Sequence, residues 1–143
     1  MTFLTKAELK TVADLAIVDI ITSLDDSIIS DIISESIDVM SSYLSNYYNA
    51  IEIFNKTGDA RSLMVLKHLK DIVIYEIYIR HTRDMNEVAK IRYEEAMNWL
   101  EKMNTGEFKD SRLPPVPDAI GSINDQASME MRFSSEPKYK SSF

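Results

Sequence analysis

The chain has 143 residues, 45% of them hydrophobic, which is enough for one domain with a core but too little for two. It has no cysteine, which excludes disulfides and thiolate metal sites. Most of the net charge of -7 comes from residues 1–50, which hold eight acidic residues against two lysines, a net of -6, whereas residues 51–106 balance nine acidic with nine basic residues. This distribution argues against gripping DNA, which requires clustered positive charge.

The N-terminal stretch MTFLTKAELK predicts neither a signal peptide nor a membrane anchor. It places a lysine and a glutamate where a signal peptide needs an unbroken apolar run, and no uncharged apolar stretch of the chain approaches membrane-spanning length. We therefore expect a soluble protein that is not exported and does not contact a membrane.

The first two helices are indicated by caps and by helical spacing of apolar residues. Thr5 and Glu8 form a capping-box pattern, which predicts a first helix over about residues 6–15. Asp25 or Asp26 is placed to cap the second helix. One stripe of that helix is expected to face the core through Ile29, Ile33, Ile37, Met40, Leu44 and Tyr47.

A third helix is expected over residues 61–81, after a break at Gly58. This run is apolar almost all round, which predicts burial on more than one side. Ile74 and Tyr78 share a side with Lys67 and Asp71, opposite the main apolar stripe. A small bundle of four helices has little room to hide that second side, so we expect Ile74 and Tyr78 at a subunit or portal interface.

The fourth helix is expected over about residues 86–104, with Gly106 as its C-terminal stop. Its apolar face predicts three core anchors, Trp99, Tyr93 and Leu100. A ligand-stacking role for Trp99, the only tryptophan, is the weaker alternative. The whole pattern predicts an all-α protein, a compact bundle of about four helices with an extended C-terminal tail.

The composition changes near residue 113, where Pro114, Pro115 and Pro117 come close together before a Ser-rich stretch. We expect a helical domain over residues 1–112 and a tail over residues 113–143, in which residues 118–130 have the length for a short helix. The tail is either disordered or an arm that becomes ordered on a partner. The anchors of such an arm would be Phe133, Tyr139 and Phe143.

Catalytic and metal-binding patterns are missing from the sequence. There are two histidines and three glycines, and no HExxH, ExxH or Gly-rich phosphate loop. His68 and Asp71 lie one helical turn apart, but two ligands make a poor metal site, and a surface histidine beside a carboxylate explains them more simply. We expect no enzyme, no metal and no cofactor.

Three segments carry a resemblance to a known family: IDVMSSYLSNYY, GDARSLMVLKHLKDIVIYEIYIR and RYEEAMNWLEKMNTGEF. In this order and spacing they resemble small helical phage and prophage proteins related to the Mu-like neck protein, found also in prophages of Bacteroides-type gut bacteria. The resemblance runs from about Phe3 to Pro115. Its most specific residues are Tyr43, Leu44, Asp71, Ile72, Tyr75, Tyr78, Arg80, Tyr93, Ala96, Trp99, Leu100 and Gly106.

The resemblance implies a structural virion protein, a head-tail connector or head-completion protein made in the host cytoplasm and located in the virion neck. Such a protein forms a ring, twelvefold if it matches a portal, that joins the portal to tail or neck proteins without a cofactor. DNA passes through the ring without specific binding. The alternative is a helical adaptor or immunity-like binding protein that uses its acidic face to bind a basic protein partner.

An acidic stripe on the second helix is formed by Asp31, Glu35 and Asp38, opposite the side of Ile33, Ile37 and Met40. An ordinary solvated face explains this pattern, because surface helices usually carry charge. In a connector ring the same stripe is placed to border the DNA channel, where its charge repels phosphates over about 8 Å at physiological salt.

Overall fold

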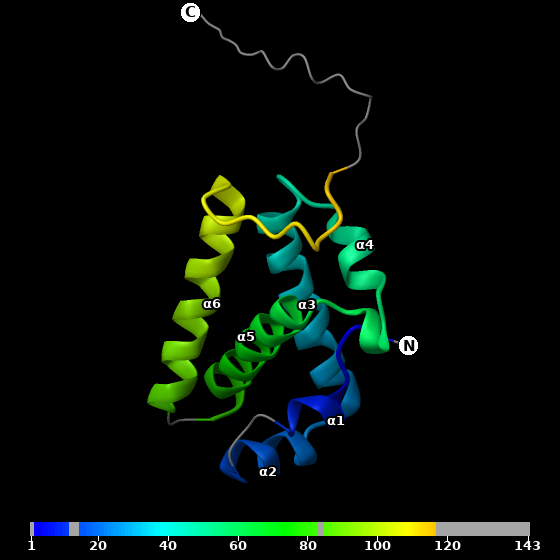
Figure 1. Cartoon of the computed structure of the whole chain (residues 1–143). Coiled ribbons are helices and arrows are strands. Elements are labelled where there is room, and N and C mark those ends of the chain that lie inside the picture. Colours follow the sequence, from blue (N-terminus) through cyan, green and yellow to red (C-terminus); the bar gives the residue numbers. More distant parts are fainter. Residues whose placement is uncertain (1, 12–14, 83–84, 117–143) are drawn as a thin grey trace, which may run out of the picture.

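The computed structural model describes residues 2–11, 15–82 and 85–116 (Figure 1). This part of the chain is all-α, as expected, and four of its six α-helices are longer than two turns. The elements are α1 Lys6–Leu9, α2 Leu15–Ser23, α3 Asp26–Leu44, α4 Ala50–Asn55, the 3-10 helix η1 Gly58–Ala60, α5 Leu63–His81 and α6 Glu87–Thr105. Phe133, Tyr139, Phe143 and the short helix expected within residues 118–130 lie outside the described residues.

The expected first helix over residues 6–15 is wrong in its extent. The capping box forms, with the Thr5 hydroxyl accepting a hydrogen bond from the Glu8 backbone N–H, but α1 ends at Leu9. A separate helix that the sequence did not predict, α2, begins at residue 15 and buries Ile17 and Ile21 in the core. Two short helices can each turn an apolar face inward where one longer helix would leave part of it exposed.

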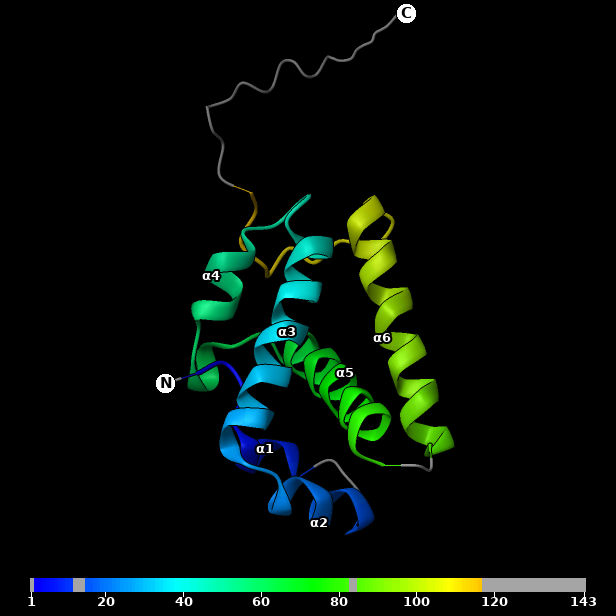
Figure 2. The ribbon, with the colours of Figure 1, turned by 180° about the vertical axis from the view of Figure 1, so that it is seen from behind.

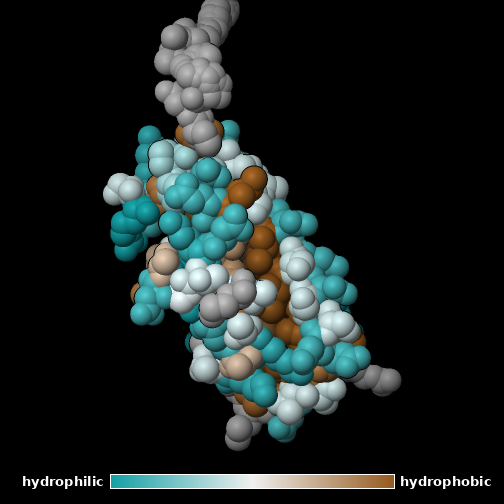
Figure 3. Space-filling model, turned by 90° about the vertical axis from the view of Figure 1, so that its right-hand side faces the viewer, coloured by the Kyte–Doolittle hydropathy of each residue, from teal (hydrophilic) through white to brown (hydrophobic). Residues whose placement is uncertain are grey.

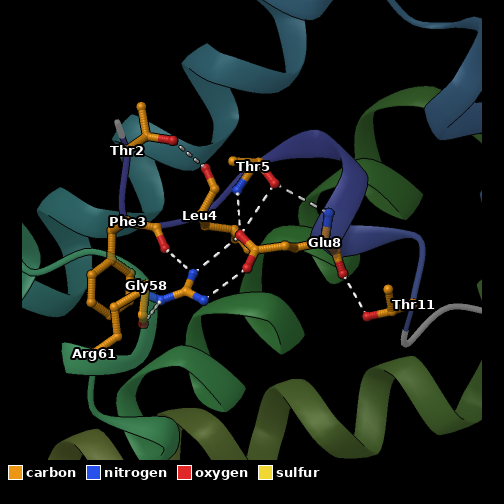
Figure 4. A network of polar contacts seen from close by, with 8 residues as sticks. All are labelled: Thr2, Phe3, Leu4, Thr5, Glu8, Thr11, Gly58 and Arg61. Atoms are coloured by element: carbon orange, nitrogen blue, oxygen red, sulfur yellow. Dashed lines mark hydrogen bonds and ion pairs between the residues drawn. The ribbon is translucent and has the colours of Figure 1, made fainter.

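Arg61 ties the N-terminal segment to the turn before α5 (Figure 4). Its guanidinium donates hydrogen bonds to the carbonyl oxygens of Phe3, at 2.7 Å, and Gly58, at 2.8 Å. It also pairs with the Glu8 carboxylate, at 2.8 Å. This arrangement joins α1 to η1, 53 residues further along the chain, and the ring of Phe3 packs edge-on against Phe54 of α4.

The second expected helix is α3, which follows Asp25 as N-cap, although the Asp25 side chain makes no capping hydrogen bond. Most of the predicted stripe is buried, but Tyr47 lies beyond the end of the helix and is exposed, so its assignment to the stripe is wrong. Between α3 and α5, where only a break was expected, the chain forms α4 and η1. Asn49 starts α4 by accepting a hydrogen bond from the Glu52 N–H.

Helix α5 lies at the centre of the bundle and is buried on several sides, as predicted. It packs against α6, α3 and α2. In Figure 1 α5 is in front of α3, and in the view from behind α3 is in front of α5 (Figure 2). Helix α6 flanks both, so the outer sides of α3 and α5 face opposite directions.

Helix α6 stops at Gly106, as predicted, because this residue adopts the left-handed conformation, with φ 83°. A Cβ there would meet the Tyr47 hydroxyl at 3.0 Å, so glycine is also needed for close packing. Residues 107–116, the C-terminal strap, then run back across the end of the bundle toward α4 (Figure 1).

The C-terminal strap is part of the helical domain, so the boundary expected at residue 112 is too early. Leu113 is buried in the core. The Asn49 N–H donates to the Pro114 carbonyl at 2.9 Å, and the Val116 N–H donates to the Tyr47 carbonyl at 3.1 Å. These backbone bonds hold the chain against the α3–α4 connection through residue 116, in a region where sequence composition alone suggested a free tail.

Candidate functional site

The predicted core anchors lie between α5 and α6. Leu100 and Trp99 are buried, which confirms their expected role, and Tyr93 is half-buried with its ring stacked on Tyr75 at 3.8 Å between centroids. The Trp99 indole stacks on the His68 imidazole, with 4.4 Å between ring centroids. Trp99 is therefore a packing residue that joins α6 to α5.

His68 and Asp71 are buried side chains, so their assignment to the surface is wrong. They are 5% and 6% exposed because α6 covers this side of α5. Neither His68 ring nitrogen has a hydrogen-bond partner in the described part of the chain, and burial lowers the His68 pKa to about 4. Burial likewise raises the pKa of Asp71, although the Lys67 ammonium lies 3.5 Å from its carboxylate.

Among the described residues, no group of three or more His, Asp or Glu side chains is placed to hold a metal ion. His68 and Asp71 thus shape the core between α5 and α6, and their titration affects stability.

Ile74 and Tyr78 are also buried, and their assignment to an interface is wrong. They are 7% and 8% exposed within a single copy of the chain. The sequence argument assumed four helices, whereas α2 adds a further packing partner for α5 beside α3 and α6. Ile74 and Tyr78 therefore belong to the core of a single copy.

Apolar side chains are exposed elsewhere. The most exposed are Leu63 at 79%, Ile51 at 76%, Val88 at 56%, Ile79 at 51% and Ile91 at 50%. Figure 3, which shows the side on which α4 lies in Figure 1, also reveals an apolar furrow running down the molecule between more polar borders. Large contiguous apolar patches mark contacts with other macromolecules, whereas single exposed apolar side chains are common on any protein surface.

The acidic stripe of Asp31, Glu35 and Asp38 is exposed along the outer side of α3, while Ile33 and Met40 on the other side are buried. The structure adds a partner that the sequence did not reveal. Arg80 of α5 pairs with Glu35 at 2.8 Å, and this contact raises the pKa of Arg80. The free negative charge of the stripe therefore comes from Asp31 and Asp38.

Residues 2–112 match the family model described as Bacteriophage Mu, Gp36. The chain belongs to the bacteriophage Mu Gp36 family. Comparison with curated proteins and with solved structures gives no match. The matched range includes every helix of the Gp36-family bundle and ends inside the C-terminal strap.

This Gp36-family chain is thus a phage protein, and the family suggests a role in phage structure or assembly. None of its described helices is both long and apolar enough to cross a membrane. Its candidate functional features are three exposed surfaces: the acidic stripe on α3, the apolar furrow, and the apolar residues at the beginning of α5. Sequence reasoning found the first of these and missed the other two, because periodicity identifies an apolar side chain without showing whether another element covers it.

Proposed function

We propose that this protein is a head-tail connector, a neck ring that joins the portal of the capsid to the tail and surrounds the DNA channel. The observation that carries the proposal is the match of residues 2–112 to the Mu Gp36 family. The proposal includes the Mu-like neck or head-completion branch, placement in the virion neck, and the portal, tail proteins and further copies of the chain as partners. The protein is not an enzyme in this proposal.

The surfaces of the bundle support a role in assembly. Leu63 and Ile51 are both more than three-quarters exposed, and isolated globular proteins gain nothing from leaving such side chains in water. A ring subunit covers apolar surface with its neighbours and with the portal. The net charge of -7 also suits a protein that DNA passes without binding.

The proposal is tested in the phage or prophage that encodes the protein. A strain with the gene deleted should yield heads and tails that fail to join, and expression of the wild-type chain in trans should restore joined particles. Because the chain has no cysteine, one cysteine introduced at exposed Lys90 allows a gold label to be attached to a single position. Electron microscopy should then find the label at the neck.

Joined, infectious particles from the deletion strain would refute the connector role. So would a label found on the capsid wall or the tail fibres. Either outcome leaves membership of the family untouched.

A second candidate function is a helical adaptor that binds a basic protein partner through the acidic stripe. The carboxylates of Asp31 and Asp38 favour it, because they are exposed and have no ion pair within the part of the chain that the structure describes. This function predicts a stable one-to-one complex that can be recovered from infected cells, and no repeated copies in the particle. Mass measurement of complexes recovered with the tagged chain separates it from the connector.

A further inference from the structure

The beginning of α5 presents an apolar projection between two hollows. Leu63, at 79%, is the most exposed large apolar side chain in the described part of the chain. On one side it borders a hollow of about 330 Å³ formed with η1 and the C-terminal strap. On the other side it borders a hollow of about 400 Å³ between α5 and α6. A protruding apolar side chain between two hollows can fit into a partner surface and receive side chains from it. Leu63 is not needed for the core of the fold, because it lies in solvent.

Three cationic side chains outnumber two anionic ones around the second hollow. Lys67, Lys70 and Arg92 line it together with Asp71 and Glu95. Lys67 lies 3.5 Å from Asp71, whereas Lys70 and Arg92 have no ion pair within 4.0 Å among the described residues. The surface made by Leu63, Lys67, Lys70 and Arg92 is called the α5 patch below. It combines an apolar projection with two cations, Lys70 and Arg92, that have no ion pair among the described residues.

The acidic stripe on α3 has the complementary character. Asp31 and Asp38 are exposed and have no ion pair among the described residues, and the apolar side chains of Ile28 and Val39 beside them are 37% and 43% exposed. Figures 1 and 2 show α3 and α5 packed one behind the other, and the Glu35–Arg80 ion pair joins the stripe to the C-terminal end of α5. The α5 patch lies at the other end of α5, so one copy carries an acidic surface and a basic surface at different places.

We propose that the α5 patch binds the acidic stripe of a second copy of this chain, head to tail. A contact of either surface with itself brings like charges together, which disfavours a two-fold dimer through either one. A contact between the two different surfaces joins opposite charges and leaves one surface free at each end, so that further copies add until a ring closes.

This inference rests on the proposed ring and names the surfaces that build it. It also places the acidic stripe at the contact between neighbouring copies, whereas the sequence suggested a place at the border of the DNA channel. A stripe covered by the neighbouring copy does not line the DNA channel.

Cysteine cross-linking tests the contact directly, since the natural chain has no cysteine. The double variant Leu63→Cys/Asp38→Cys is assembled into particles and treated with a short bis-maleimide cross-linker. We expect a ladder of cross-linked oligomers on a denaturing gel. Each single variant should remain monomeric, and so should Lys90→Cys/Asp38→Cys, in which the second cysteine lies on α6 outside both surfaces.

Several results would overturn the contact. A dimer from Leu63→Cys alone shows that the α5 patch meets its own copy, and a ladder only from the Lys90 control places the contact elsewhere. No cross-link from any variant in particles that contain the protein excludes the head-to-tail contact. Particles that lack the protein altogether instead refute the proposed connector function, so the two failures are distinguishable.

A charge exchange gives a second test that does not depend on cross-linking. Lys70→Glu/Arg92→Glu should lower the yield of joined particles by at least about tenfold, because like charges then face each other across the contact. Adding Asp31→Lys/Asp38→Lys to the same chain should restore most of that yield. Lys90→Glu/Lys109→Glu makes the same change in net charge outside both surfaces and should assemble normally.

The melting temperature of each charge variant shows that it is folded before its assembly is scored. A fourfold variant that assembles no better than the twofold variant would overturn the proposal. Equal loss in the Lys90→Glu/Lys109→Glu control would do the same, because total charge and not the named contact would then govern assembly.

Discussion

At the scale of single residues, His68 is the side chain whose surroundings fit it least. Its ring stacks on Trp99 while both nitrogens lack hydrogen-bond partners in the described structure. A buried polar atom without a partner costs on the order of 1 to 3 kcal/mol. The structure keeps His68 neutral because protonation would place a charge inside the core.

Acid should therefore destabilise the protein through His68. Burial lowers its pKa from 6.5 in the unfolded chain to about 4, so between these values the unfolded state binds the proton more readily. Above pH 6.5 His68 is neutral in both the folded and the unfolded protein, and its titration does not affect the free energy of unfolding. As the pH falls from 6.5 toward 4, the free energy of unfolding decreases. His68→Phe keeps an aromatic ring against Trp99, so its melting temperature should fall less than that of the wild type over this range.

The same variant should be more stable than the wild type at pH 7, by on the order of 1 kcal/mol, because the two unpartnered nitrogens are gone. The raised pKa of Asp71 acts in the opposite direction just above pH 3.8, and comparing the two proteins removes that effect. If the melting temperatures of the two proteins instead fall by the same amount between pH 6.5 and pH 4, His68 is accessible to solvent and the prediction is wrong.

Trp99 is the residue whose loss should cost most. It is 8% exposed and connects α6 to α5 through His68. Trp99→Ala should lower the free energy of unfolding by about 3 to 5 kcal/mol, measured by urea denaturation. A change below about 1 kcal/mol would mean that the indole is solvent-exposed in solution.

At the scale of the elements, α5 has more packing partners than the sequence predicted, because α2 packs against it in addition to α3 and α6. Its second apolar side is covered inside one copy, so Ile74 and Tyr78 are core residues. Ile74→Asp should therefore unfold the monomer, because an unpaired buried charge costs several kcal/mol. Circular dichroism of the purified variant measures whether it is folded. A variant that stays helical but fails to assemble would contradict the prediction and show that Ile74 lies at an interface.

The attachment of α1 to η1 gives a second prediction at this scale. The hydrogen bond from Arg61 is the largest cause of the lowered Glu8 pKa. Since the folded-state pKa lies below the ordinary value of 4.5, the stabilisation is present above pH 4.5 and is lost as the pH falls through the folded-state value. Glu8→Gln should be less stable than the wild type at pH 7, and the difference should shrink on acidification below pH 4.5.

At the scale of the whole molecule, folding and assembly use different residues. The core is built from apolar faces of α2, α3, α5 and α6, whereas the charges of the acidic stripe lie outside it. Asp31→Asn, Glu35→Gln and Asp38→Asn together should change the free energy of unfolding by less than about 1 kcal/mol, since exposed ion pairs contribute little. Urea denaturation measures this.

In particles, the same triple variant should reduce joining of heads to tails if the stripe contacts a neighbouring copy. Normal joining with slowed genome ejection would instead place the stripe on the channel wall. Unfolding of the variant would contradict the separation of folding from assembly.

The sequence by itself determined the features that depend on neighbours along the chain. Caps and periodicity predicted α3, α5 and α6 nearly to their ends, and the left-handed preference of Gly106 set the stop of α6. The same periodicity placed Asp31, Glu35 and Asp38 on one exposed stripe and identified Trp99 as a core anchor. These are local properties of a helix, fixed by 3.6 residues per turn.

Only the tertiary structure decided which apolar faces are covered. It buried Ile74 and Tyr78 within a bundle in which α5 packs against α2, α3 and α6, and it left Leu63 in solvent. It also paired Glu35 with Arg80 and drew the C-terminal strap onto the α3–α4 connection. Each of these outcomes depends on elements distant in sequence meeting in space, and the energy of such contacts is not encoded in any one segment.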